Sequence, residues 1–168
     1  MQFFYWLLLI VGGFLLGSIM FCELIPKKVL NKDVCKISVD NNPGAFNVFK
    51  HCGKKIGILC LLLDVSKGFV PVFLVSIFFD TDNVAFTLVM VAPPLGHAIG
   101  LFNRFRGGKC IAANFGVMLG IIPVTCIGIC ALAALFILFS TLIKIKNPAK
   151  RSVLVFALYA LTVCPVLC

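Results

Sequence analysis

The stretch FNRFRGGKCIAANFG, residues 102–116, is a short basic loop between two apolar segments. Three cations and a pair of glycines lie within six of its residues: Arg104, Arg106, Gly107, Gly108 and Lys109. Glycine lets the backbone come close to an anion, and the three cations make the local potential strongly positive. A second loop, DNNPGAFNVFKHCGKK at residues 40–55, has the same character. Two such loops between apolar segments predict a site for phosphorylated substrates at a membrane surface.

The composition of the chain indicates an integral membrane protein. Hydrophobic residues make up 61% of the sequence and charged residues only 12%. A soluble domain is nearer half apolar and a quarter charged. The 168 residues leave room for about five or six membrane-spanning helices of ~20 residues with short loops. We therefore expect an all-α fold, a polytopic helical bundle that forms one membrane domain over residues 1–168.

Apolar runs along the chain predict about six transmembrane helices. Their approximate bounds are residues 3–25, 56–79, 84–102, 111–122, 124–143 and 153–168. The fourth and fifth come from one run, residues 111–143, whose 33 residues are too long for one upright helix at about 1.5 Å per residue. Gly120 and Pro123 lie within this run, so we divide it there, with one kinked helix as the alternative.

The charges of the connecting loops predict how the helices are oriented. Residues 26–55 carry seven lysines against two aspartates, and residues 103–109 and 144–151 carry three and four cations without an acid. The short loop 80–83 has two aspartates and no base. The positive-inside rule places basic loops in the cytoplasm. We therefore expect a multi-pass protein of the cell membrane, with the site loops on the cytoplasmic face and the N-terminus outside.

Two other ligand classes, metal ions and nucleic acids, are not favoured by the sequence. The nine cysteines form no CxxC motif and mostly lie in apolar runs. Cys126 with Cys130, and Cys164 with Cys168, share helix faces that in principle suit a soft metal, but no histidine or carboxylate is near them in sequence. We interpret them as small core residues and expect no metal or other cofactor. The net charge of +9 is spread over short loops, which favours anionic lipid headgroups over nucleic acid.

Four short motifs follow one another along the chain. They are GSI (residues 17–19), NPGAFNVFK (42–50), DVSKGFVPV (64–72) and GHAIGLFNRFRGGKCIA (96–112). In this order they resemble the PlsY-type acyl-phosphate:glycerol-3-phosphate acyltransferases, and the resemblance covers roughly residues 16–143. It implies a helical membrane enzyme that transfers a fatty acyl group from acyl phosphate to the 1-hydroxyl of glycerol 3-phosphate, giving lysophosphatidate without a metal.

The implied reaction needs a site for two anions side by side. An acyl phosphate is already activated, so no covalent enzyme intermediate is required, and the site has to align the hydroxyl and stabilise developing negative charge. We expect Lys109 and His97 to be catalytic. Lys109 suits the phosphate and the oxyanion as a point charge, with a membrane anchor as its alternative role. His97 is suited to act as a general base or to bind phosphate, and its alternative role is to cap a carbonyl at the end of a helix.

Residues of both loops are expected to bind the substrates: Asn42, Gly44, Asn47, Lys50, Arg106, Gly107 and Gly108. Three other polar residues are expected to support the site. Asp64 and Lys67 are spaced i, i+3 in an apolar run, so they can pair on one helix face, with direct substrate contact as the alternative. Ser18 is expected to pack against a neighbouring helix.

Several positions depart from the first-loop pattern of the family, GSGNxGATNxxR. Asp40 stands where a small serine would meet phosphate, and a carboxylate there repels phosphate. Phe46 replaces a threonine, Lys50 stands at the usual arginine, and Cys110 replaces the glycine after GGK. The resemblance also implies a final helix and a tail with histidine and asparagine, for which we find no match before Cys168.

Three classes of function are compatible with the sequence. The first is the acyltransferase, with acyl phosphate, glycerol 3-phosphate and membrane lipids as partners and with an oligomeric state that the sequence leaves open. The second is a catalytically impaired relative that binds phosphorylated lipid precursors or a partner enzyme. The third is a small transporter, which calls for polar residues near the bilayer midplane and for internal symmetry. Only Asp64 and Lys67 fit that description, and we find no repeat.

Overall fold

The computed structural model describes residues 2–121 together with Leu154, Ala157 and Leu158. The chain divides into two compact units, Met1–Gly120 and Ile121–Cys168, of which the first holds the helices α1 to α7. Its elements are α1 Gln2–Gly17, α2 Phe21–Leu30, α3 Val34–Ile37, α4 Ala45–Cys52, α5 Lys54–Phe78, α6 Val84–Ile99, the 3-10 turn η1 Leu101–Asn103 and α7 Ile111–Gly120. These residues contain no strand, as the expected all-α fold requires. Apart from the three isolated residues, the helices expected at 124–143 and 153–168 lie outside the described residues.

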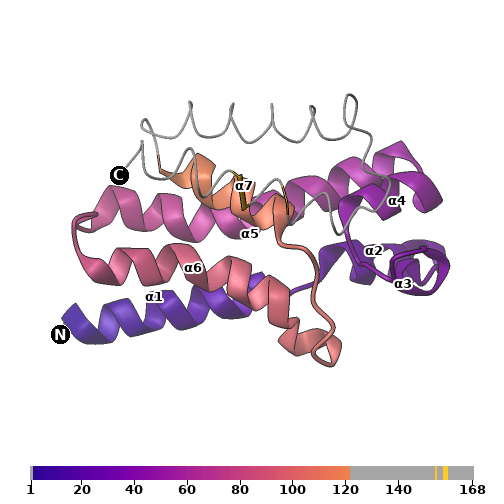
Figure 1. Ribbon diagram of the computed structural model, residues 1–168. Coiled ribbons are helices and arrows are strands. Elements are labelled where there is room, and N and C mark those ends of the chain that lie inside the picture. Colours follow the sequence, from indigo (N-terminus) through magenta and orange to yellow (C-terminus); the bar gives the residue numbers. More distant parts are fainter. Residues whose placement is uncertain (1, 122–153, 155–156, 159–168) are drawn as a thin grey trace. The chain divides into compact units, whose positions relative to one another are not determined.

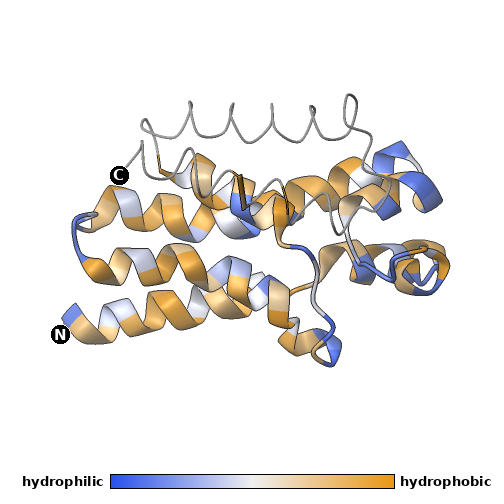
Figure 2. Ribbon diagram, viewed as in Figure 1, coloured by the Kyte–Doolittle hydropathy of each residue, from blue (hydrophilic) through white to orange (hydrophobic). Residues whose placement is uncertain are grey.

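Two helices of this unit are long and apolar enough to cross a membrane. They are α5 and the segment Val84–Asn103, which joins α6 to η1. The pair α1 and α2 passes the same test only if the two count as one span, because they are bent by 44° at their junction. Hydrophobic residues dominate α1, α5 and α6, and hydrophilic residues gather in the connecting segments (Figure 2). The unit is therefore a membrane-protein bundle with two or three spans among the described residues.

A single helix over residues 3–25 was expected, and this expectation is wrong. The helix α1 ends at Gly17, and α2 begins at Phe21. The hydroxyl of Ser18 donates a hydrogen bond to the carbonyl of Phe14 at 2.9 Å, a back-bond that bends helices. The carbonyl of Ile19 accepts a bond from Lys67 at 2.7 Å instead of one from its own helix. The break therefore frees backbone groups for a contact with α5.

Neighbouring helices approach closely where glycine lies at the interface. The helix α1 runs beside α6, and α7 lies against α5 (Figure 1). A Cβ atom at Gly68 of α5 would overlap the carbonyl of Ala113 of α7, and one at Gly116 would overlap the carbonyl of Val65. Small residues permit such close backbone packing, which is a main source of helix association in membranes. The ten residues of α7 are thereby held along α5.

The segment 26–55, expected to be a loop, contains the end of α2 and the helices α3 and α4. The side chain of Asp33 caps α3 by accepting a bond from the backbone N–H of Lys36 at 3.2 Å. A small apolar cluster joins four elements, α2, α3, α4 and α5: Cys22, Val34, Val48 and Cys60. The segment is therefore folded against the end of the bundle and is not an extended loop.

Candidate functional site

The basic loop after α6 folds back across the last turn of that helix. Gly100 ends α6 in the left-handed conformation, at φ 61°, and the chain then turns through η1. The backbone N–H of Gly108 donates to the carbonyl of His97 at 3.0 Å. The amide of Asn103 donates to the carbonyl of Arg106 at 2.9 Å and to the carboxylate of Glu23. These bonds tie the loop to both α6 and α2.

The glycine pair has a packing role that the sequence did not reveal. A Cβ atom at Gly107 would overlap the carbonyl of Ala98, and one at Gly108 would overlap Nε2 of His97. The two glycines therefore let the loop lie directly on α6. The predicted close approach of this backbone to an anion stays a prediction.

Lys109, Asp40 and Asn47 form the polar centre of the site. The Nζ atom of Lys109 is 2.7 Å from Oδ2 of Asp40, and the side-chain amide of Asn47 donates to Oδ1 of Asp40 at 2.8 Å. The same amide of Asn47 also donates to the carbonyl of Asn42 at 2.8 Å. Lys109 and Asp40 keep 24% and 22% of their side-chain surface exposed. The structure thus brings the two basic loops together on one carboxylate.

Asp40 is ionised at neutral pH in this setting. Burial acts to raise its pKa, but hydrogen bonds from Lys109 and Asn47 and the charge of Lys109 outweigh burial and hold the pKa below its usual value. An ionised carboxylate accepts hydrogen bonds at both oxygens, and both are used here.

The remaining residues expected to bind substrate lie around this centre. Asn42 and Gly44 form the turn before α4, in which the N–H of Gly44 donates to the carbonyl of Asn42 at 2.9 Å. Gly44 is the N-cap residue of α4. Lys50 and Arg106 are exposed and have no ion pair among the described residues. Both are therefore cations at the surface, outside the hydrogen-bonded centre.

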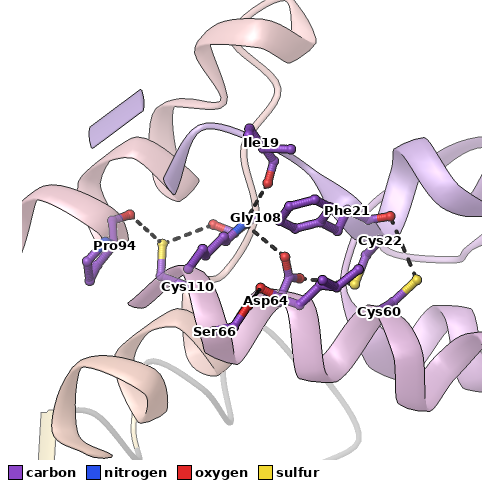
Figure 3. Close-up of polar contacts among 11 residues, drawn as sticks. Ile19, Phe21, Cys22, Cys60, Asp64, Ser66, Pro94, Gly108 and Cys110 are labelled. Carbon is purple, nitrogen blue, oxygen red and sulfur yellow. Dashed lines mark hydrogen bonds and ion pairs between the residues drawn. The ribbon is translucent and has the colours of Figure 1, made fainter. Parts of the chain in front are cut away.

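Asp64 and Lys67 form a buried ion pair inside the bundle. Nζ of Lys67 lies 2.9 Å from Oδ1 of Asp64, and the two side chains are 0% and 2% exposed. Oδ2 of Asp64 accepts a bond from the thiol of Cys22 at 3.0 Å, and Nζ of Lys67 lies 5.8 Å from the ring centre of Phe21 (Figure 3). With the bond to Ile19, these contacts connect α5 to the break between α1 and α2. Charges at this depth persist only when they are paired.

His97, Ser18 and Cys110 are packed between the helices and the loop. His97 is buried, its Nε2 faces Gly108, and its Nδ1 has no hydrogen-bond partner among the described residues. Ser18 is fully buried, and its backbone nitrogen lies against Gly96 of α6. The thiol of Cys110 donates to the carbonyl of Pro94 at 3.2 Å (Figure 3). Burial raises the pKa of Cys110 to about 11, so this thiol stays protonated at neutral pH.

A separate group of possible metal ligands lies beside the site. The group consists of Glu23, Asp33 and Cys35. Each offers one ligand atom, and these three atoms lie within 4.8 Å of one another. The thiol of Cys35 donates to Glu23 at 3.6 Å, and burial together with the carboxylate of Glu23 raises the pKa of Cys35 to about 12. Asp33 caps α3, and Glu23 also accepts a bond from Asn103. All three side chains therefore have protein partners.

The sequence indicated most of the polar residues of the site but not their hydrogen-bond partners. Asp40 was visible as a departure from the family motif, but its pairing with Lys109, across 69 positions, was not. The contact between Asn103 and Glu23 joins positions 80 apart and has no local signal. The pairing of Asp40 depends on how the segment 26–55 folds, and the pairing of Glu23 depends on how α2 packs; the apolar pattern alone did not predict either.

The described residues define a class of protein: a helical membrane protein in which two basic segments meet at one carboxylate, that of Asp40. The profile of the family described as glycerol-3-phosphate acyltransferase matches residues 7–168. The chain therefore belongs to the glycerol-3-phosphate acyltransferase family, and the resemblance seen in its four motifs is confirmed.

Curated relatives and solved structures agree with this membership. Glycerol-3-phosphate acyltransferase 2 of Thermotoga maritima is 41% identical over 113 residues, which are 67% of this chain and 57% of the relative. The glycerol-3-phosphate acyltransferase of Geotalea daltonii is 36% identical over 147 residues, 88% of this chain and 72% of the relative. The crystal structure of PlsY (YgiH), an integral membrane glycerol 3-phosphate acyltransferase, in its glycerol 3-phosphate form superposes with a TM-score of 0.72 at 29% identity. The superposition covers 94% of this chain and 87% of the PlsY chain. The chain spans less than two thirds of the length of the Thermotoga maritima relative.

Proposed function

We propose that this chain transfers a fatty acyl group from an acyl phosphate to the 1-hydroxyl of glycerol 3-phosphate, forming lysophosphatidate for phospholipid synthesis. The observation that carries the proposal is the convergence of Lys109, from the loop after α6, and Asn47, from α4, on the two oxygens of one carboxylate. The same donors suit two oxygens of a phosphate, a group that both substrates contain. Membership of the family and the likeness to PlsY in its glycerol 3-phosphate form support the assignment.

In the proposed reaction the chain holds and aligns two anions. The hydroxyl of glycerol 3-phosphate attacks the acyl carbon, the bond from that carbon to the phosphate oxygen breaks, and inorganic phosphate leaves, while the hydroxyl proton passes to the leaving phosphate or to His97. Lys109 neutralises charge on the phosphate, and the amide of Asn47 fixes one oxygen. The exposed cations Lys50 and Arg106 attract both substrates to the loops. Bonds from Asn103 and Gly108 fix the loop backbone, so its donors are in place before substrate arrives.

His97 is proposed to serve the same site as base or phosphate ligand. Its Nδ1 supports this role, because a buried nitrogen that has no hydrogen-bond partner among the described residues is available to accept a proton. Its position under Gly108 supports a positioning role instead, since the imidazole fills the space beneath the loop. Turnover of a variant that combines Gly108→Ala with His97→Ala separates these two roles.

An acyl-transfer assay tests the proposed function directly. The full chain, purified in detergent, is given palmitoyl phosphate and radiolabelled glycerol 3-phosphate, and labelled lysophosphatidate is counted. The variant Lys109→Ala removes the point charge and is expected to lower kcat/KM by about 100-fold or more. The matched control is Lys36→Ala, which removes an exposed lysine whose only ion pair in the described residues is with Asp33 at 3.7 Å. Wild-type product no higher than in the Lys109→Ala variant contradicts the proposal.

A second candidate function is favoured by one observation. Asp40 already occupies Lys109 and Asn47, so these donors are not aligned on a reacting phosphate, which fits a catalytically impaired protein that binds phosphorylated lipid precursors. Equilibrium binding of glycerol 3-phosphate by wild-type protein, together with absence of product in the transfer assay, supports this candidate over the enzyme.

We further propose that the protein is a multi-pass protein of the cell membrane, with the site loops in the cytoplasm and the N-terminus outside. The support is the excess of lysine and arginine in these loops and the two acids at 80–83. A thiol-reactive, membrane-impermeant reagent tests the orientation on a variant with cysteine introduced at the exposed Val39. Labelling in inverted vesicles, and not in intact cells, is expected. The reverse pattern contradicts the orientation.

A further inference from the structure

The carboxylate of Asp40 takes up two central donors of the site, Lys109 and Asn47. Oδ2 accepts from Lys109 at 2.7 Å, and Oδ1 accepts from Asn47 at 2.8 Å. One negatively charged group is therefore held through two oxygens, by the loop after α6 and by α4. A bound phosphate uses donors in the same way.

We propose that Asp40 is an internal competitor for the substrate phosphate, and that it sets the affinity of the site. A phosphate gains Lys109 and Asn47 only when the carboxylate of Asp40 leaves them. This inference rests on the proposed function, because it assigns a specificity-determining residue to the same site. Binding of an anion is measurable without turnover, so the two claims can be tested apart.

The donors are anchored to helices, whereas Asp40 lies in the turn between α3 and α4. Asn47 is buried in α4 and also donates to the carbonyl of Asn42. Lys109 follows Gly108, whose N–H is bonded to α6. Asp40 lies between α3 and α4, next to Val39, which is 94% exposed, and beside Asn41 at φ 48°. Movement of this turn frees the donors without disturbing the helices.

Electrostatics makes the exchange all-or-none. A phosphate and the carboxylate held a few ångströms apart repel each other, so both do not share the donors. A dianionic phosphate with three oxygens interacts with Lys109 more strongly than the monoanionic carboxylate does. Asp40 is ionised throughout the neutral range because its pKa is held below its usual value. The competitor is therefore present at physiological pH, and it opposes weakly charged ligands most.

Removal of the Asp40 charge is expected to tighten phosphate binding. Binding of glycerol 3-phosphate and of inorganic phosphate is measured by isothermal titration calorimetry on the full chain in detergent, for wild type, Asp40→Ser and Asp40→Asn. Charge-assisted hydrogen bonds are among the stronger interactions in proteins, so we expect Kd to fall by about tenfold in both variants. Asp40→Asn is nearly isosteric and keeps an oxygen for Asn47, so it preserves the fold.

Asp33→Asn is the matched control for the loss of one negative charge. Asp33 lies in the same segment, pairs with the exposed Lys36, and caps α3, a role that asparagine fills equally well. Its Kd is expected to equal that of the wild type. An equal fall of Kd in Asp33→Asn would assign the effect to net charge and overturn the proposal. An unchanged or higher Kd in both Asp40 variants also overturns it.

Acyl transfer is measured on the same preparations, so that the two claims fail separately. Tighter phosphate binding by the Asp40 variants, without product from any preparation, supports the competitor and contradicts the proposed enzyme. Product from the wild type, with unchanged Kd in the Asp40 variants, supports the enzyme and contradicts the competitor.

Discussion

The Nζ atom of Lys67 lies 2.7 Å from the main-chain oxygen of Ile19, at the break between α1 and α2. The same ammonium group pairs with Asp64 at 2.9 Å on its own helix. One buried charge therefore satisfies both a carboxylate and a carbonyl that the broken helix has left open. The first apolar segment bends at the place where this lysine meets it.

Loss of Lys67 is predicted to destabilise the protein strongly. In Lys67→Met the carboxylate of Asp64 stays buried without its counter-charge, and such a group costs about 3–5 kcal/mol. Thermal unfolding in detergent, followed by circular dichroism, measures the loss. The double variant Asp64→Leu/Lys67→Met removes both charges and is expected to recover more than half of it. A single variant that unfolds at the wild-type temperature would show that the pair contributes nothing.

A methyl group at Gly68 is predicted to separate α5 from α7. The Cβ atom of Gly68→Ala meets the carbonyl of Ala113, and backbone cannot move aside as a side chain can. Overpacking of this kind typically costs about 1–3 kcal/mol, and we expect a corresponding fall in melting temperature.

Gly12→Ala is the matched control for that change. Gly12 lies in α1 and has no neighbour within 4 Å of the added Cβ atom. Its melting temperature is expected to be equal to or slightly above that of the wild type, because alanine favours helix more than glycine does. Equal losses in the two variants would contradict the packing argument.

The apolar spans could be predicted from the sequence because hydropathy alone determines them. The helix expected at 56–79 is α5 at Lys54–Phe78, and the one expected at 84–102 is α6 with η1. The break after Gly17 was not predicted from hydropathy, because apolar residues continue through it, and the bond from the distant Lys67 to Ile19 at the break has no local signal. The hydropathy of neighbouring residues predicts which segments are buried, whereas a hydrogen bond between distant segments depends on the tertiary structure.

The candidate site shows the same division. Lys109 and Asn47 were recognised from the glycine-containing motifs around them. Their common partner Asp40 was recognised only as an unfavourable charge near a phosphate. Its actual place, between the two donors, follows from the folding of 26–55 into α3 and α4. A carboxylate in a basic loop is therefore a candidate partner for the lysine of the other loop.

Acid is predicted to remove the stabilising contribution of Asp40. The pKa of Asp40 is lower in the folded state than its ordinary value of 3.8, so its ion pair stabilises the fold above that value. The contribution is lost as the pH falls through the lowered pKa, because protonation ends the pairing with Lys109. In phosphate-free buffer, wild type is expected to melt above Asp40→Asn from pH 8 to about 5. The difference should shrink below about pH 4. A difference that persists unchanged at pH 2 contradicts the shift.

The amide of Asn103 is predicted to hold the basic loop in its active position. Asn103→Ala removes the bonds to Glu23 and to the carbonyl of Arg106, while the helices keep their contacts. We expect kcat/KM for acyl transfer to fall by about tenfold with little change in melting temperature. The control is Asn83→Ser. Asn83 is the N-cap residue at the start of α6, the end opposite to the basic loop, and serine is an equally suitable N-cap residue. Equal activity of the two variants contradicts a role of Asn103 in the loop.

Gly108 and His97 are predicted to be coupled through one steric contact. A Cβ atom at Gly108 overlaps Nε2 of His97, and no positive φ at Gly108 forbids alanine. Gly108→Ala should therefore lift the loop from α6 and weaken glycerol 3-phosphate binding by about tenfold, measured by calorimetry. His97→Ala empties the space, so the double variant should bind more tightly than Gly108→Ala alone. Strictly additive effects of the two substitutions contradict the contact.

Turnover of the same double variant separates the two roles of His97. If the imidazole only fills the space beneath the loop, acyl transfer returns together with glycerol 3-phosphate binding. If it also accepts the proton of the attacking hydroxyl, binding returns while kcat stays low, because alanine has no group to replace it. The ratio of recovered kcat to recovered affinity therefore assigns His97 to positioning or to catalysis.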